Sequence, residues 1–145
     1  MTTRRATLDD LPALVPLFDG YRVFYRQPSD RAGSEAFLRE RLERGEAVVF
    51  LAEHDGQAVG FTLLYPSFSS VRMAPIWVLN DLFVAESSRR TGAGRALLDA
   101  AHAHARTTGA VVVVLATGHA NTTAQRLYEA TGFEKDPVYT YIRKV

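Results

Sequence analysis

Glycines and arginines follow an apolar stretch in the middle of the chain, in a pattern typical of a phosphate site. Residues 76–85 have the continuous hydrophobicity of a central strand, a polar loop follows, and Gly92 and Gly94 open a segment with helical periodicity. Glycine lets backbone amides point into one concavity, and the free N–H groups and positive dipole end of a helix favour an anion there. Three arginines crowd the same loop with no acid among them: Arg89, Arg90 and Arg95. We predict a phosphate-bearing ligand at this loop, and a pyrophosphate fits best.

Two common nucleotide-binding loops do not match this segment. A Walker A loop requires Gly-x-x-x-x-Gly-Lys-Ser/Thr, and neither that lysine nor its metal-binding hydroxyl is present. A dinucleotide fingerprint requires a small residue where this chain has Leu97, and a polar insert precedes the glycines. Taken alone, the loop is also compatible with an ordinary exposed helix start that binds nothing.

A carboxylate interrupts the apolar strand that leads into the loop. Burying a carboxylate is costly unless it is paired or functional, so Asp81 is a candidate proton acceptor or amine-binding group. The alternative is a structural Asp that is salt-bridged or hydrogen-bonded below the sheet. Strand alternation places its side chain on the face that carries Trp77, Leu79 and Phe83. Glu53, on an adjoining strand, is a weaker candidate for the base.

The composition describes one globular domain. A chain of 145 residues suits a single domain, and its size allows a core that needs neither disulfides nor metals. Seventeen basic and sixteen acidic residues give a net charge of +1, which argues against a nucleic-acid partner. The absence of cysteine fits a reducing compartment. Acidic residues near the N-terminus and a longest apolar run of only residues 110–116 argue against a secretory signal or a membrane span, so we expect a cytoplasmic location.

The periodicity predicts an α/β (or α+β) fold with a mixed sheet and helices on both faces. Helices are expected over residues 11–25, 34–44, 94–107 and 121–131, and strands over 2–7, 47–53, 57–65, 76–85, 110–117 and 138–143. Thr7 and Asp10 form a capping box before the first helix, and Asp55-Gly56 predicts a hairpin turn. Residues 66–75 are predicted to be a polar loop. The helix between strands 76–85 and 110–117 implies that these two strands are parallel.

Two motifs resemble those of the GCN5-related N-acetyltransferase (GNAT) family, in the order that the family uses. Arg89-Arg-Thr-Gly-Ala-Gly94 matches its Gln/Arg-x-x-Gly-x-Gly/Ala element, and residues 121–133 resemble its Asn-x-x-Ala-x-x-x-Tyr-x-x-x-Gly-Phe element. Residues 77–84 and 110–117 resemble the family's fourth and fifth strands. The resemblance covers almost the whole chain as one N-acetyltransferase domain, residues 1–145. It implies a mixed, mostly antiparallel sheet in which the central parallel pair is splayed.

The resemblance also implies acetyl-CoA as cosubstrate, lying between the splayed strands, and no metal. The pantetheine would pair with the backbone of Leu82, Phe83 and Val84. The pyrophosphate would lie on the main-chain N–H groups of the glycine loop, whose residues are Arg89, Arg90, Thr91, Gly92, Ala93, Gly94 and Arg95. Asn121 is expected to cap the following helix through the N–H near Ala124, either as its only role or together with a contact near the pantetheine.

The resemblance assigns Tyr128 to the family's common general acid. A tyrosine with a pKa of about 10 is protonated at neutral pH, so it can donate to the departing thiolate of CoA. The alternative is a core role, since Tyr128 shares the apolar stripe of its helix with Leu127. On the family pattern, backbone N–H groups around Val84 would stabilise the oxyanion. Without cysteine no acetyl-cysteine intermediate can form, so the amine is expected to attack the thioester directly in a ternary complex.

Residues 60–84 look like the diamine/polyamine and Hpa2-like branch of the family, which acetylates small primary amines, polyamines or exposed lysines, usually as dimers. We therefore expect a primary amine acceptor, small or lysine-like, and a homodimer. Asn80 stands where polyamine enzymes tend to carry Glu, which removes one negative charge. The acceptor wall, or part of the core, is expected from Tyr21, Phe24, Tyr25, Tyr65, Phe68 and Trp77. An acyl-CoA-binding sensor or inactive partner without turnover is the alternative function.

Overall fold

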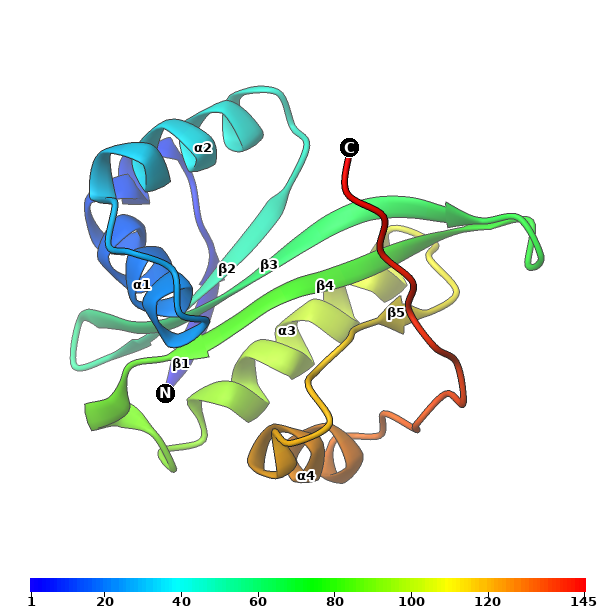
Figure 1. The fold of residues 1–145 in the computed structure, drawn as a ribbon. Helices are drawn as coiled ribbons and strands as arrows, with labels where there is room; N and C mark the ends of the chain where they lie inside the picture. The colour runs from blue at the N-terminus through cyan, green and yellow to red at the C-terminus, as the bar shows by residue number, and fades with distance from the viewer.

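A single five-stranded sheet organises the computed structural model, which describes residues 1–145 (Figure 1). The strands lie in chain order: β1 Thr2–Arg5, β2 Val48–His54, β3 Gln57–Ser69, β4 Ala74–Val84 and β5 Val113–Val114. The first four are antiparallel, and β5 pairs with β4 in parallel. The predicted mixed sheet is therefore confirmed, but the parallel pair lies at one edge of the sheet and not at its centre, because no strand follows β5.

Two helices cover each face of the sheet (Figure 1). They are α1 Leu11–Phe24 and α2 Arg31–Glu43 on one face, and α3 Ala93–Thr107 and α4 Thr122–Ala130 on the other. Short 3-10 turns, η1 Leu8–Asp10 and η2 Glu86–Ser88, precede α1 and α3. The α1/α2 face buries Leu14, Leu38, Phe61 and Leu63, and the α3 face buries Leu64, Leu79 and Leu98.

The helix starts follow local capping chemistry. The predicted capping box is present: Asp10 accepts a hydrogen bond from the Thr7 N–H at 2.7 Å, and the Thr7 side chain accepts in return from the backbone that follows. Helix α2 begins three residues before the predicted position because Asp30 caps it, accepting from the Gly33 N–H at 2.8 Å. These caps therefore fix the residues at which the two helices begin.

The predicted polar loop at residues 66–75 is wrong, because most of it is strand. Strand β3 continues to Ser69 and β4 starts at Ala74, with these two residues paired at the end of a long hairpin. The pairing of β2 with β3 ends at Val48, whose partner is Leu64. Beyond that point β3 has a neighbour on one side only, so Pro66 lies where a sheet edge tolerates the missing N–H.

One extra residue in β4 changes which side chains face which helices. Leu63 pairs with Asp81 and Leu64 with Leu79, so Asn80 is a bulge. The simple alternation predicted for this strand is therefore wrong. Before the bulge, Leu79 packs on the α3 side together with Trp77; after it, Asp81 and Phe83 share the α1 side.

The parallel pair separates almost at once. Strands β4 and β5 pair only at Trp77–Val113 and Val78–Val114, so the predicted strand at 110–117 is reduced to two residues. The predicted last strand at 138–143 does not form in this chain, and its apolar side chains are exposed: Val138, Tyr139, Tyr141 and Ile142. A strand needs a neighbour, and β5 is too short to provide one.

Candidate active site

The turn before α3 presents its backbone as an anion site. Arg90 and Gly92 have φ of 64° and 88°, and Gly92 precedes the helix without any side-chain cap. The N–H groups of the first helical turn therefore have no capping side chain, and they point out of the helix end. Gly94 is required for packing, because a Cβ there would lie 2.9 Å from Leu127 Cδ2. The local geometry is what the phosphate prediction requires.

The three loop arginines do not act alike. The side chains of Arg90 and Arg95 are exposed around the helix end. Arg89 instead turns toward α1: its Nε donates to the Val84 carbonyl at 3.2 Å and its guanidinium lies 5.8 Å from the Phe24 ring centroid. Two of the predicted arginines thus remain available to an anion, and the third bridges β4 and α1.

The end of β4 has one paired edge and one open edge. Residues 82–84 pair with Gly60 to Thr62 of β3. On the other side β5 has already diverged, so no strand pairs with this edge. Gly60 lets the strands approach closely, since a Cβ there would be 2.8 Å from the Phe83 carbonyl oxygen. Backbone groups of Leu82, Phe83 and Val84 can therefore pair with an extended ligand between the splayed strands.

Asp81 is buried, with 2% of its surface exposed. Its Oδ1 accepts a hydrogen bond from Asn80 Nδ2 at 2.8 Å, whereas its Oδ2 has no partner. Asp81 forms no ion pair, so the salt-bridged structural alternative does not apply. Burial raises the pKa of Asp81 to about 6, although the Asn80 amide and the nearby Tyr21 hydroxyl favour its charged form.

Tyr21 on α1 lies beside this carboxylate, with Tyr25 and Tyr128 near Tyr21. The Tyr21 hydroxyl donates to the Asn80 carbonyl at 3.2 Å, and its pKa is raised by burial first and then by Asp81. The Tyr21 and Tyr25 rings are 5.0 Å apart between centroids. Tyr128 on α4 is half-buried, with its pKa raised first by burial and then by Tyr25. Tyr21 thus lies beside Asp81 and Tyr25 beside Tyr21, whereas Tyr128 packs with the apolar cluster on the α3 side.

Asn121 has the capping role predicted for it. Its Oδ1 accepts a hydrogen bond from the Ala124 N–H at 3.3 Å at the start of α4. The cap fixes where α4 begins, and so it positions Tyr128 two turns later. The Tyr128 ring also contacts Phe133, with centroids 6.0 Å apart, so it belongs to both the helix stripe and the cluster.

A cavity of about 440 Å³ opens beside Asp81. Of the six predicted wall residues, only Tyr21 and Tyr65 line it. Phe68 is 80% exposed on the long hairpin, and Trp77 lies on the α3 side, where its Nε1 donates to Thr108 Oγ1 at 2.8 Å. The other lining residues, which the sequence analysis did not select, are Phe18, Arg22, Asp30, Gly33, Ser34, Phe37 and Asn80. Except for Asn80, these residues come from α1, from α2 and from the N-cap of α2, Asp30.

The remaining candidates lie elsewhere. Glu53 forms an ion pair with Arg4 at 2.8 Å and does not line the cavity at Asp81, so it is not placed to be the base. His104 packs between Phe50 and Trp77. No group of three or more His, Cys, Asp or Glu side chains could hold a metal ion. None of the helices has the length and hydrophobicity that crossing a lipid bilayer would require.

The glycine loop before α3 and the open edge of β4 are the features expected of a transferase that uses an acyl-CoA, and the comparisons identify the family. The chain belongs to the acetyltransferase (GNAT) family, whose model matches residues 14–133. Both the predicted family and its fold are confirmed, and the chain is an acetyltransferase of a family that uses acetyl-CoA.

Individual relatives agree with this assignment. An uncharacterized N-acetyltransferase, YhfO of Bacillus subtilis (strain 168), is 49% identical over 141 residues, covering 97% of this chain and 95% of that protein. A crystal structure of a probable acetyltransferase superposes with a TM-score of 0.94 at 41% identity, covering 100% of this chain and 98% of the other. The Hpa2-like branch is represented by the D-amino-acid N-acetyltransferase HPA3 of Saccharomyces cerevisiae, 32% identical over 70% of this chain and 63% of that protein.

Proposed function

We propose that this protein transfers the acetyl group of acetyl-CoA to a primary amine by direct attack in a ternary complex. The observation that carries the proposal is the buried carboxylate of Asp81, whose Oδ2 has no hydrogen-bond partner, at a cavity beside the open edge of β4. A buried carboxylate with one oxygen left without a hydrogen bond is costly for folding alone, so a cationic amine is its natural ligand.

The cofactor would enter from the α3 side of the site. The backbone of Leu82 to Val84 would pair with the pantetheine, and the N–H groups of residues 90–95 would bind the pyrophosphate, with Arg90 and Arg95 adding charge. Asn121 is half-buried at the start of α4 and would contribute near the pantetheine in addition to its cap. This arrangement would put the thioester between β4 and Tyr128.

Asp81 and Tyr128 would carry out two separate proton transfers, one from the amine and one to the leaving thiolate. A primary amine has a pKa near 10.4 and arrives as ammonium, so it must lose a proton before its nitrogen forms the bond to the thioester carbon. Asp81, with a pKa of about 6, is ionised at neutral pH and would accept that proton. As the C–S bond breaks, Tyr128 would donate its proton to the CoA thiolate; the second proton that the nitrogen loses on becoming an amide would restore the Tyr128 phenol, and Asp81 would release its proton to solvent. Because burial raises its pKa, Tyr128 holds that proton at neutral pH.

An assay of thiol release with acetyl-CoA tests this proposal. We expect turnover with at least one acceptor in a panel of diamines, polyamines, amino acids, aminoglycosides and a lysine peptide. Tyr128→Phe should lower kcat by about 10²- to 10⁴-fold with CoA affinity unchanged, because the phenyl ring keeps the packing against Phe133. Full activity of Tyr128→Phe would remove the acid assignment. Tight CoA binding with no turnover would instead support the acyl-CoA sensor.

We also propose that the protein is a cytoplasmic homodimer. The apolar side chains of residues 138–142 lie exposed at the C-terminus, beyond the short β5, and a second copy of the chain would cover them. Light scattering should give twice the mass of one chain, and a chain ending at Asp136 should give the mass of one. A monomeric full-length chain would refute the dimer. The absence of cysteine from the chain supports the proposed cytoplasmic location, which is a reducing compartment.

A further inference from the structure

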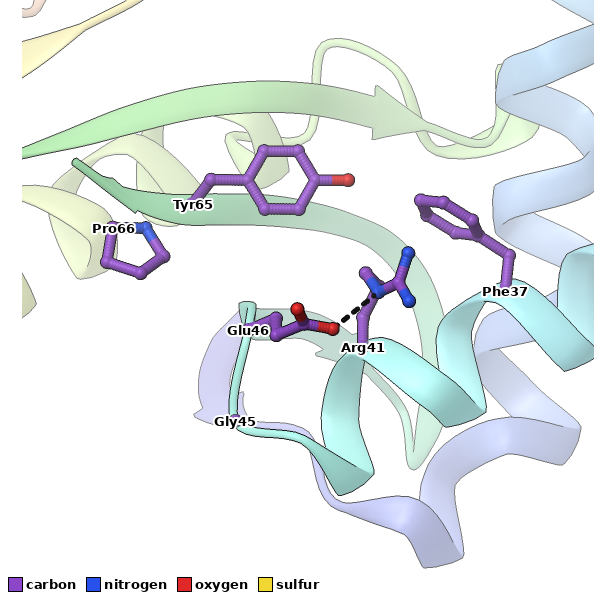
Figure 2. Close-up of a pocket in the computed structure, with 6 residues that line it drawn as sticks. All are labelled: Phe37, Arg41, Gly45, Glu46, Tyr65 and Pro66. Atoms are coloured by element: carbon purple, nitrogen blue, oxygen red, sulfur yellow. Dashed lines mark ion pairs between the residues drawn. The ribbon is translucent and has the colours of Figure 1, made fainter.

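A second cavity continues the acceptor cavity along α2. It has a volume of about 510 Å³ and shares two lining residues, Phe37 and Tyr65, with the cavity at Asp81. Its other lining residues are Arg41, Gly45, Glu46 and Pro66 (Figure 2). The two cavities therefore form one groove, which starts at the reactive carboxylate and ends where α2 ends.

Tyr65 lies between the charged groups at the two ends. Its ring projects over the second cavity, opposite Phe37 and Arg41 (Figure 2). Its pKa is raised by burial first and then by Asp81, and it is lowered by Arg41, so both charges act on the same phenol. A ligand that passes Tyr65 therefore meets Asp81 on one side and Arg41 on the other.

The far end of the groove presents a cation and an anion side by side. Arg41 Nε lies 3.1 Å from Glu46 Oε1, and Arg41 Nη2 lies 3.1 Å from Glu40 Oε2. The guanidinium also lies 4.9 Å from the Phe37 ring centroid, and its side chain is only 21% exposed. Yet Nε is buried without a properly aligned hydrogen bond. Arg41 is thus neutralised by its neighbours but has donors to spare.

A zwitterion fits this pairing better than a simple amine does. A carboxylate could take the free donors of Arg41, since guanidinium and carboxylate form charge-assisted, often bidentate hydrogen bonds. An ammonium next to that carboxylate would lie against Glu46. A diamine or polyamine could place its second ammonium against Glu46 too, but it would leave the free donors of Arg41 without an acceptor. The amino and carboxylate groups of an amino-acid head satisfy both residues together.

We propose that the groove binds a diamino acid such as lysine or ornithine, head first. Its α-carboxylate contacts Arg41, its α-ammonium contacts Glu46, and its side chain passes Tyr65 to place the terminal amine beside Asp81. The inference rests on the proposed amine acetylation, and it adds the acceptor class and the nitrogen that is acetylated. The acetyl group moves from the CoA sulfur to the side-chain nitrogen, and the nitrogen's protons leave as described above.

Four acceptors of related structure test the proposal. Lysine and ornithine carry the full head, cadaverine is lysine without its carboxylate, and 6-aminohexanoate is lysine without its α-amine. We expect kcat/KM for lysine or ornithine to exceed that for cadaverine by about tenfold or more, as loss of a charge-assisted contact implies. NMR of the product should show acetylation on the side-chain nitrogen.

Two substitutions and one control assign the head contacts. Arg41→Gln should raise KM for the diamino acid about tenfold and leave cadaverine turnover intact or improved, so that cadaverine serves as the folding control. Glu46→Gln should raise KM for the diamino acid, which loses the contact to its α-ammonium. It should lower KM for 6-aminohexanoate, because Arg41 loses one of its two competing anions. Arg39→Gln is the matched control, since Arg39 lies on the same helix, pairs with Glu35 at 2.9 Å and lines neither cavity.

Three results would overturn the proposal and leave amine acetylation standing. The first is cadaverine turnover equal to that of the diamino acids, and the second is acetylation of the α-nitrogen. The third is an Arg41→Gln variant in which kcat/KM falls equally for all acceptors. Absence of turnover with every acceptor in both panels would overturn the proposed function, and this inference with it.

Discussion

Asp81→Asn should make the protein more stable at neutral pH while it lowers activity. The substitution keeps the shape of the side chain, and its oxygen can still accept the hydrogen bond from Asn80 Nδ2. The new amide nitrogen would replace Oδ2, which has no partner, close to the Tyr21 hydroxyl. What the variant removes is the charge of a carboxylate that the fold has buried.

The size of the gain follows from the pKa of Asp81. Its pKa is about 6 in the folded chain against an ordinary value of 3.8, and each pH unit between them corresponds to about 1.4 kcal/mol. Ionised Asp81 therefore costs the folded state about 3 kcal/mol. Because the folded pKa is the higher one, this cost is absent below pH 3.8, grows between pH 3.8 and 6, and is complete above pH 6.

Thermal unfolding at pH 8 and pH 4 measures the difference between the variant and the wild type. At pH 8 we expect the Tm of Asp81→Asn to be higher by roughly 6–12 °C, at about 2–4 °C per kcal/mol for a domain of this size. At pH 4 most of the gain should disappear. Asp99→Asn, at an exposed position on α3, is the matched control and should change Tm little at either pH.

The same variant links stability to turnover. Loss of the proton acceptor should lower kcat/KM by about 10²- to 10⁴-fold, and the wild-type rate should fall as the pH drops through 6. A variant that is destabilised at pH 8, or equally stabilised at both pH values, would refute the reasoning. Asp81 would then be a structural residue whose charge the fold needs.

Other predictions test the remaining parts of the site. Replacing Arg90 and Arg95 together with Gln should raise the Kd for CoA about three- to tenfold at low salt, with a smaller difference at high salt because exposed charges are screened; isothermal titration would measure both. Trp77→Phe should cost about 1–2 kcal/mol in urea unfolding, since it loses the hydrogen bond to Thr108, and an altered acceptor KM would contradict its place on the α3 side. Gly60→Ala should lower stability by about 1–3 kcal/mol in the same assay, because its Cβ would meet the Phe83 carbonyl; an unchanged midpoint would show that the strands can separate freely there.

The half of the site that we propose for the cofactor could be predicted in its local geometry from the sequence, because its signals are local. The glycines, the helix start at Ala93 and the Asn121 cap depend on neighbouring residues, and each lies where the pattern indicated. The acceptor half depends on a register shift between two strands. Nothing in the spacing of residues 76–85 indicated that Asn80 would be skipped, so the face assigned to Trp77 was wrong.

Pairing partners explain the other differences. Residues 66–75 contain proline and several serines, which suggested a loop, but two strands at the edge of the sheet can pair around them. Residues 138–143 have the composition of a strand and lack a neighbour in this chain. The groove along α2 depends on Phe37 and Arg41, which the sequence placed on a helix without any sign that they would line a cavity.

The bulge at Asn80 divides β4 into two stretches under different constraints. Residues 74–79 supply the packing under α3, so substitutions there should be limited by side-chain volume. From Asp81 onward the strand supplies a charge and an open backbone edge, so chemistry limits substitution there instead. A deletion at position 80 would restore a regular ladder with Leu79 and Asp81 as neighbours on opposite faces, but it would remove the amide that donates to Asp81 and the carbonyl that accepts from Tyr21. One inserted residue thus gives β4 two separate roles, packing under α3 before Asn80 and exposure of Asp81 and a free backbone edge after it.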